Sequence, residues 1–264
     1  MSWSEVPTSR LRGRRAFVTG AGSGIGQACA LRLTAEGAAV AVADVRADLV
    51  KELAAQITSN GGRAEAFTND VSDEASTAAV VAEAASHLGG LDTVVVCAGI
   101  LYAAMTHEMT LEQWQLVIGV NLTGTFLPVK HALPHLMQAR GGCIVTIGSI
   151  ASVVAGGYAP AYDASKAGVV ALTRAVAVQY ADRGIRANCV CPGHVATGLK
   201  SHSAETMASV ATGQESTPAQ RVQVPMDRRG EPSEIAAAVA FLCSDDASFM
   251  TGATVMVDGG YTIV

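Results

Sequence analysis

The chain has 264 residues, half of them hydrophobic and 16% charged, with a formal net charge of −5. This length suits one large α/β domain, and a mildly acidic chain without a dense basic stretch argues against nucleic acid as a partner. No run of about 18 uninterrupted apolar residues indicates a membrane helix, and the first 15 residues lack the apolar core of a signal peptide.

The cysteines and histidines give no pattern typical of a disulfide framework or a metal site. Five of the six cysteines lie in strongly apolar stretches, which is typical of buried thiols. His131 and His135 have zinc-like spacing, but Pro134 separates them and no third ligand is evident. We therefore expect a reduced, cytoplasmic protein without a metal centre. The cysteines are Cys29, Cys97, Cys143, Cys189, Cys191 and Cys243.

Short β-rich apolar runs alternate with helical patterns along the whole chain. Strands that are apolar on both faces and separated by helices are typical of a parallel sheet covered on both sides, so we expect a doubly wound α/β fold. No linker divides the chain, which predicts a single domain over 1–264. The predicted strands are Arg15–Thr19, Ala39–Asp44, Ala64–Asn69, Thr93–Cys97, Cys143–Ile147, Ala187–Cys191 and Thr254–Val257. The predicted helices are Ile25–Glu36, Asp48–Ser59, Glu74–His87, Leu111–Gln138, Ala164–Ala181 and Ser233–Cys243.

The first predicted strand runs into the sequence T-G-A-G-S-G-I-G, which leads directly into a helix. Glycines here permit a tight turn and a close approach of the backbone to a pyrophosphate. Amides at the start of the following helix point at the anion, along with the positive end of the helix dipole. The strand before and helix after make this a specific signal for dinucleotide binding. The candidate residues are Gly20, Ser23, Gly24, Ile25 and Gly26.

Asp44 ends the second predicted strand, about 20 residues after the glycine turn. A carboxylate there can bind the adenine ribose hydroxyls and would repel a 2′-phosphate. Sites that prefer NADP offer a basic residue instead, whereas this chain has Ser23 in the turn and Val45 after the acid. Arg46 is close but competes with Asp44. The pattern therefore favours NAD over NADP. Without the glycine turn upstream, the better interpretation of Asp44 would be an ordinary solvated acid at a strand end.

Several other signals mark the ends of elements. Asp70, after the third strand, can bind adenine or cap the helix that begins near Asp73, and the sequence favours neither role. Thr110 and Gln113 have capping-box spacing. Pro232 suits a first helical position, and Pro128 predicts a kink within a long helix.

The fifth predicted strand delivers Ser149 at its carboxyl end, where ligands bind in open α/β sheets. Further along, Tyr162 and Lys166 are four residues apart on a helix and share a face. A free tyrosine has a pKa near 10, and a neighbouring ammonium lowers the pKa enough for acid/base catalysis. A surface Tyr and Lys would be the better interpretation of this spacing without the glycine turn.

The stretch from 198 to 225 is a long, polar connection between a strand and a helix. Connections of this length are usually lids or binding loops, so we expect it to cover the substrate, with a disordered insertion as the alternative.

These motifs together resemble the short-chain dehydrogenase/reductase family over almost the whole chain. The resemblance rests on three features. They are the glycine turn, the set of Ser149, Tyr162 and Lys166 with twelve residues between the serine and the tyrosine, and the segment Pro192-Gly193-His194-Val195-Ala196-Thr197. It implies a Rossmann-type domain with a seven-stranded parallel sheet, a Tyr162 acid/base, a Lys166 activator and a substrate-orienting Ser149. The resemblance also gives Asn121 a role in a proton relay, and further cofactor contacts to Asp70, Val71, Ala98, Gly99, Pro192, Gly193, Val195 and Thr197.

The chain departs from the family at Val96 and Cys97, where two asparagines are common, which puts the usual hydrogen bonds there in doubt. The predicted helix at 164–181 is apolar almost all round, so we expect a partner subunit to cover it, in a dimer or tetramer. The main hypothesis is hydride transfer between NAD(H) and a secondary alcohol or ketone. The alternatives are an NADPH-dependent 3-oxoacyl-carrier-protein reductase and a catalytically silent nucleotide sensor.

Overall fold

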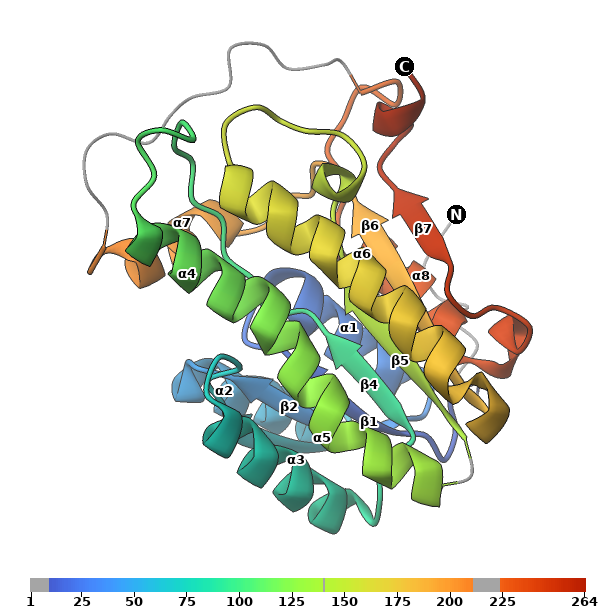
Figure 1. Cartoon of the computed structure of the whole chain (residues 1–264). Coiled ribbons are helices and arrows are strands. Elements are labelled where there is room, and N and C mark those ends of the chain that lie inside the picture. Colours follow the sequence, from blue (N-terminus) through green and yellow to red (C-terminus); the bar gives the residue numbers. More distant parts are fainter. Residues whose placement is uncertain (1–9, 140, 211–223) are drawn as a thin grey trace.

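The computed structural model describes residues 10–139, 141–210 and 224–264. Its centre is a parallel sheet of seven strands in the order β3-β2-β1-β4-β5-β6-β7 (Figure 1). The order reverses between β1 and β4, which opens a crevice at the carboxyl ends of these strands. The predicted doubly wound fold is confirmed. The strands are β1 (Arg15–Thr19), β2 (Ala39–Asp44), β3 (Arg63–Thr68), β4 (Thr93–Val96), β5 (Gly142–Ile147), β6 (Ile185–Pro192) and β7 (Thr254–Val257).

Helices cover both faces of the sheet (Figure 1). One face carries α1 (Gly24–Ala35), α2 (Ala47–Ser59) and α8 (Pro232–Cys243). The other carries α3 (Glu74–Leu88), α5 (Gly124–Gln138) and α6 (Pro160–Tyr180). The two remaining helices are α4 (Leu111–Ile118), which precedes α5, and α7 (Leu199–Met207), which lies beside α4 in the connection after β6.

The strand β1 shows why the apolar runs lack alternation. Ala16 and Val18 pack into the core beneath α1 and α8, while Phe17 between them packs into the core beneath α3 and α5. All three side chains are fully buried. A strand with two covered faces needs apolar residues at every position, so its sequence is a continuous apolar run.

The predicted helix at 111–138 is one helical run in three parts. α4 is followed by a π-helical turn over Gly119–Thr123, and α5 then continues through Pro128. The irregularity therefore lies before the proline at which a kink was predicted. The run is long and apolar enough to cross a membrane by composition, but half of it is buried. Lys130 and His131 of α5 also contact Glu74 of α3, so this is a core helix of a globular fold.

Three local predictions can be compared directly. The Thr110–Gln113 capping box is confirmed, and Pro232 is the first residue of α8. Asp73, rather than Asp70, caps α3 by accepting from the Ser76 amide. The α6 helix begins at Pro160, four residues earlier than predicted, because a proline at the first helical position provides a ready start.

Candidate functional site

The turn between β1 and α1 leaves no room for side chains at its glycines. Gly20 has φ +62°, and a Cβ atom there would lie 2.6 Å from the Ala98 amide nitrogen. A Cβ on Gly26 would lie 2.1 Å from the Gly20 carbonyl oxygen. The turn is thus pressed against both α1 and the loop after β4. This close packing fits the glycine pattern that brings backbone amides up to a pyrophosphate.

The first turn of α1 is open to an anion. Ser23 is the N-cap residue, yet its side chain accepts no hydrogen bond from the helix amides. No acidic residue lies in this turn. The amides that follow Ser23 are therefore available to a phosphate group at the positive end of the helix.

Asp44 lies beside this turn at the end of β2 and is 7% exposed. Its Oδ2 accepts from the Gly22 amide at 3.0 Å, and its Oδ1 accepts from the Arg46 amide at 3.0 Å. A Cβ on Gly22 would lie 2.9 Å from that same Oδ2, so the carboxylate needs a glycine opposite. The Arg46 guanidinium bridges Asp44, at 3.3 Å, and the Ser23 hydroxyl, at 2.9 Å.

Thr19 braces the loop after β4, where the expected family asparagines are missing. Its hydroxyl oxygen accepts from the Cys97 amide at 3.2 Å and lies 3.5 Å from the Ala98 amide. Next in this loop, a Cβ on Gly99 would lie 3.3 Å from the Lys166 ammonium nitrogen. Glycine here keeps the loop close to the catalytic candidates without displacing them.

Asn121 is fully buried within the π-helical turn and ties the β4 loop to α6. Its Oδ1 accepts from the Ile100 amide at 2.8 Å, and its Nδ2 donates to the Ile100 carbonyl at 2.9 Å. The same Nδ2 donates to the Ser165 hydroxyl at 3.0 Å. The side chain therefore positions the elements around the site, as π-helical turns often do near functional residues.

Ser149 is held at the end of β5 by a short 3₁₀ turn over Ile150–Ser152. Its hydroxyl accepts from the Ala151 amide at 3.1 Å. Ser152 accepts from the Ser149 amide at 3.2 Å and donates to the Lys166 carbonyl at 2.9 Å. The strand end that carries Ser149 is thus fixed to the helix that carries the other two candidates.

Tyr162 and Lys166 lie one turn apart on α6. The Lys166 ammonium donates to the Ile147 carbonyl at 2.9 Å and lies 5.7 Å from the centre of the Tyr162 ring. Burial raises the pKa of Tyr162 to about 12, while a hydrogen bond with Ser149 opposes that rise. Burial also lowers the pKa of Lys166. Burial is thus the largest influence on the pKa of this phenol, and it acts against the lowering expected from a neighbouring lysine.

The segment after β6 closes the other side of the crevice. A Cβ on Gly193 would lie 2.7 Å from the Asp258 Cα, and Val195 pairs with Gly230. Thr197 faces the glycine turn, because a Cβ on Gly24 would meet its methyl group at 3.4 Å. This motif and the glycine turn are therefore brought together, as predicted.

Asp70 and Val71 follow β3 and differ in their surroundings. Asp70 is exposed, and its Oδ1 accepts from the amide and the hydroxyl of Ser72. Val71 is buried and lies against Gly124, at which a Cβ would be 2.6 Å from the valine methyl.

The α7 helix forms part of the predicted covering segment, and residues 211–223 of that segment lie outside the described residues. Ser203 of α7 accepts from the Leu101 amide at 2.8 Å. Gln113 of α4 donates to the Val210 carbonyl at 2.9 Å. Met207 is 1% exposed and belongs to an apolar cluster with Tyr102, against which Tyr162 packs. α7 thus covers the catalytic candidates.

Four of these bracing residues have no signal of their own in the sequence. Thr19, Ser152, Ser165 and Ser203 act through contacts between elements that are distant along the chain. Thr19 is the first residue of the glycine-rich motif, and Ser165 lies between Tyr162 and Lys166, where its hydroxyl donates to the Tyr162 carbonyl at 2.7 Å.

The cysteines contribute packing near the site. Five are buried and none is paired. The Sγ atoms of Cys189 and Cys191 are 3.9 Å apart and fill the space next to Gly148, where a Cβ would lie 2.7 Å from the Cys191 sulfur. Over the described ranges, no group of three or more His, Cys, Asp or Glu side chains could hold a metal ion.

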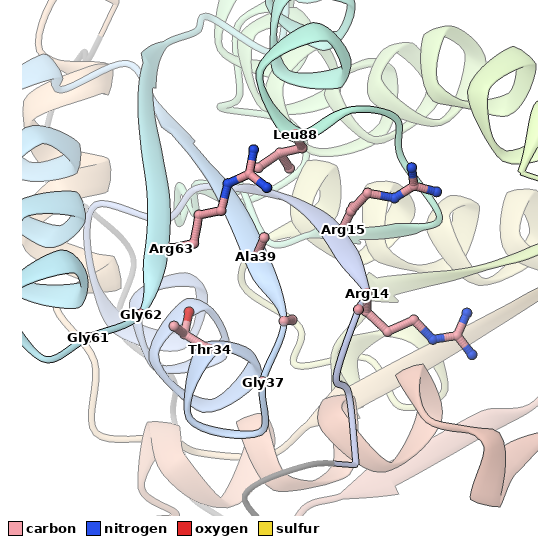
Figure 2. Close-up of a pocket in the computed structure, with 11 residues that line it drawn as sticks. Arg14, Arg15, Thr34, Gly37, Ala39, Gly61, Gly62, Arg63 and Leu88 are labelled. Carbon is pink, nitrogen blue, oxygen red and sulfur yellow. The ribbon is translucent and has the colours of Figure 1, made fainter.

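A cavity of about 390 Å³ lies away from this site, at the amino ends of β1, β2 and β3 (Figure 2). Arg14, Arg15 and Arg63 line it. Arg15 donates to the Gly89 carbonyl and Arg63 to the His87 carbonyl, both at the C-terminal end of α3. Arg14 and Arg15 also form ion pairs with acidic side chains. These arginines are engaged with carbonyl oxygens at the end of α3 and with carboxylates. We therefore interpret the cavity as a region that caps the helix end.

Comparison with known proteins agrees with the fold and the crevice. Residues 20–262 match the model of a family described as enoyl-(acyl carrier protein) reductase. The chain is 44% identical to a cis-4-hydroxycyclohexanecarboxylate dehydrogenase of Sinomonas cyclohexanicum, covering 95% of this chain and 97% of that protein. It is 37% identical to a cyclohexanol dehydrogenase of an Acinetobacter species, with 98% of each chain covered.

Solved structures give the same result. A short-chain type dehydrogenase/reductase from Mycobacterium marinum superimposes with a TM-score of 0.86 at 34% identity, covering 96% of this chain and 97% of that chain. A putative NAD(P) dependent gluconate 5-dehydrogenase from Beutenbergia cavernae, with bound NADP, superimposes with a TM-score of 0.85 at 36% identity. That match covers 98% of this chain and 100% of the other.

The chain belongs to the short-chain dehydrogenase/reductase family. It is an NAD(P)-dependent enzyme that oxidises or reduces small molecules at a CH–OH group. The expected enzyme class is therefore confirmed, and the alternative of a silent nucleotide sensor is not supported.

Proposed function

We propose that this enzyme interconverts a secondary alcohol and its ketone, with Tyr162 as the acid/base. The observation that carries the proposal is the convergence of Tyr162, Lys166 and Ser149 beside the loop after β4, which itself packs against the glycine turn. The bound dinucleotide would supply or accept the hydride. The phenol of Tyr162 gives its proton to the substrate oxygen in ketone reduction and takes it back in alcohol oxidation.

The other candidates act by position and charge. Ser149 hydrogen-bonds the phenol and orients the substrate oxygen. Lys166 sits between the tyrosine ring and Gly99, so its charge stabilises a phenolate and its ammonium can bond the nicotinamide ribose. Asn121 fixes the Ile100 backbone and Ser165 around them, and this is compatible with the relay role that the family implies.

We infer NAD as the preferred dinucleotide, because the Asp44 carboxylate stands where a 2′-phosphate would bind. The contacts of Gly22 and Arg46 with Asp44 hold the carboxylate in place. The observation that favours the NADPH-dependent alternative, a 3-oxoacyl-carrier-protein reductase, is the Arg46 guanidinium, which also contacts Ser23 at the same turn. Its charge is already paired with Asp44, so the repulsion of a phosphate prevails.

Initial rates with NADH and NADPH test this preference. We expect the wild-type enzyme to favour NADH and Asp44→Ala to lose about tenfold or more of its kcat/KM for NADH, because hydrogen bonds to a charged group are lost. Asp48→Ala, an exposed acid in the first turn of α2, is the matched control and should leave the preference unchanged. A wild-type preference for NADPH would contradict the proposal.

We infer an alicyclic secondary alcohol as the substrate class. Tyr162 packs against an apolar cluster of Ile100, Tyr102, Val117 and Met207, which suits contact with a hydrocarbon ring. The relatives named above for cyclohexanol and a hydroxycyclohexanecarboxylate support this choice. Rates with cyclohexanol, glucose and 2,3-butanediol would test it, and a higher kcat/KM for glucose would contradict it.

We further propose a single catalytic domain that works in the cytoplasm as a homodimer or homotetramer. The support is the one continuous sheet and the outward face of α6, which carries the exposed residues Ala167, Ala171, Ala175 and Val178. An apolar helix face of this kind is normally covered by a partner.

A further inference from the structure

The α7 helix spans both halves of the site. Its last residue, Met207, is buried in the apolar cluster that packs against Tyr162. Its fourth residue, His202, lies at the other half, beside the glycine turn. Because α7 is only nine residues long, one small rigid unit contacts both the catalytic candidates and the dinucleotide turn.

The His202 ring is held in a narrow position. Its Nδ1 lies 3.4 Å from the Ser23 hydroxyl oxygen. A Cβ on Gly198 would lie 2.8 Å from the Cε1 atom of the ring, so the ring also packs closely against this glycine. The ring is half-buried between the α7 N-terminus and the turn that receives the pyrophosphate.

The hydrogen bonds of Ser23 orient this ring. The Ser23 oxygen accepts from the Arg46 guanidinium at 2.9 Å, which leaves its own proton for the Nδ1 of His202. In the tautomer that accepts this bond, the ring N–H is on Nε2. Over the described part of the chain, no hydrogen bond engages Nε2 of His202. The ring therefore presents an N–H donor next to the first turn of α1, whose N-cap side chain accepts no hydrogen bond from the helix amides.

We propose that His202 is a further dinucleotide-binding residue, which donates a hydrogen bond to the pyrophosphate from α7. The inference rests on the dinucleotide binding described above. It explains why an N-cap serine leaves its helix amides uncapped: the Ser23 hydroxyl is used to orient His202, and the amides and the imidazole share one anion.

Calorimetric titration of the full-length protein tests the inference without any turnover. The ligands are NADH and ADP-ribose, which both contain the pyrophosphate, and adenosine, which lacks it and is measured by competition with NADH. For His202→Ala we expect the Kd for NADH and ADP-ribose to rise about five- to tenfold, as for the loss of one hydrogen bond to a charged group. The Ki for adenosine should not change.

Two further variants separate binding from folding. His202→Gln retains an N–H donor and should recover most of the affinity, while Glu205→Ala, on the exposed side of the same helix, should bind like wild type. An unchanged Kd in His202→Ala would overturn the inference, and so would an equal loss of adenosine binding. A wild-type protein that binds neither NADH nor NADPH would instead overturn the proposed function itself.

Discussion

The environment of Tyr162 determines how a single residue can serve both directions of the reaction. Burial raises the pKa of its phenol to about 12, and the Ser149 hydrogen bond opposes this only in part. A group with this pKa keeps its proton at neutral pH. Tyr162 is therefore ready to donate a proton to a ketone, whereas alcohol oxidation needs the rarer phenolate.

The two directions should therefore respond differently to pH. Since the phenolate fraction rises as pH approaches the pKa from below, kcat/KM for alcohol oxidation should increase between pH 7 and pH 10, by up to about tenfold per unit. Ketone reduction should not increase over this range. Initial rates in both directions provide the measurement, and an oxidation rate that falls from pH 7 upward would contradict the account.

At this scale the sequence identifies residues whose chemistry is local. Tyr162 and Lys166 are one helical turn apart, so their spacing alone brings them together. Thr19 and Ser152 were not predicted, because their partners are the Cys97 amide and the Lys166 carbonyl, which only the folded sheet brings near. The sequence predicted a lowered pKa for Tyr162, whereas the structure raises it to about 12, because burial of the phenol depends on tertiary packing.

Some elements around the site pack so closely against neighbouring backbone that only glycine fits at the point of contact. Gly26, in the first turn of α1, packs directly against the Gly20 carbonyl. Gly119, at the end of α4, has no atom near the position that a Cβ would take. Both glycines lie in helical segments, but only Gly26 has a neighbouring atom where a Cβ would be. The same substitution should consequently have opposite effects at the two positions.

Gly26→Ala should lower the thermal unfolding midpoint and weaken NADH binding, because its methyl group would lie 2.1 Å from a carbonyl oxygen. Gly119→Ala is the matched control and should stabilise the fold by about 0.5–1 kcal/mol, as alanine does for glycine in a helix. Thermal unfolding with and without NADH measures both effects. A Gly26→Ala protein that folds and binds like wild type would exclude this role for the turn.

The element boundaries that failed were those set by packing. Apolar periodicity predicted one helix over 111–138 with a kink at Pro128, and it did not place the π-helical turn at Gly119–Thr123. The start of α6 was placed at Ala164, whereas Pro160 gives a local signal that the prediction did not use. The predicted ends of the β-strands lie within two residues of the observed ends. Because helices cover both faces of the sheet, each strand is a continuous apolar run that is easy to find in the sequence.

In the part of the chain that the structure describes, the outward face of α6 carries exposed apolar residues. The α5 and α6 helices lie side by side on one face of the sheet (Figure 1). On α6, the exposed residues Ala167, Ala171 and Ala175 form a flat surface, and Val178 is 83% exposed. Small side chains permit the close approach of a second helix, which is why we assign this face to subunit contact.

A charge on this face should break the assembly. Sedimentation of wild type should give a mass of two or four 26.9 kDa chains, and Ala171→Glu should shift it towards one chain because two buried carboxylates would face each other. Ala82→Glu, at an exposed position of α3, is the matched control and should sediment like wild type. A wild-type monomer would refute the proposed assembly.

The role of Tyr162 is tested most directly by Tyr162→Phe, which removes one hydroxyl from the buried ring. Turnover of the alcohol substrate and the Kd for NADH should be measured on the same preparation. The account predicts that kcat falls by about 10²- to 10⁴-fold while the Kd for NADH stays within about twofold of wild type. A variant that turns over substrate at nearly the wild-type rate would contradict it.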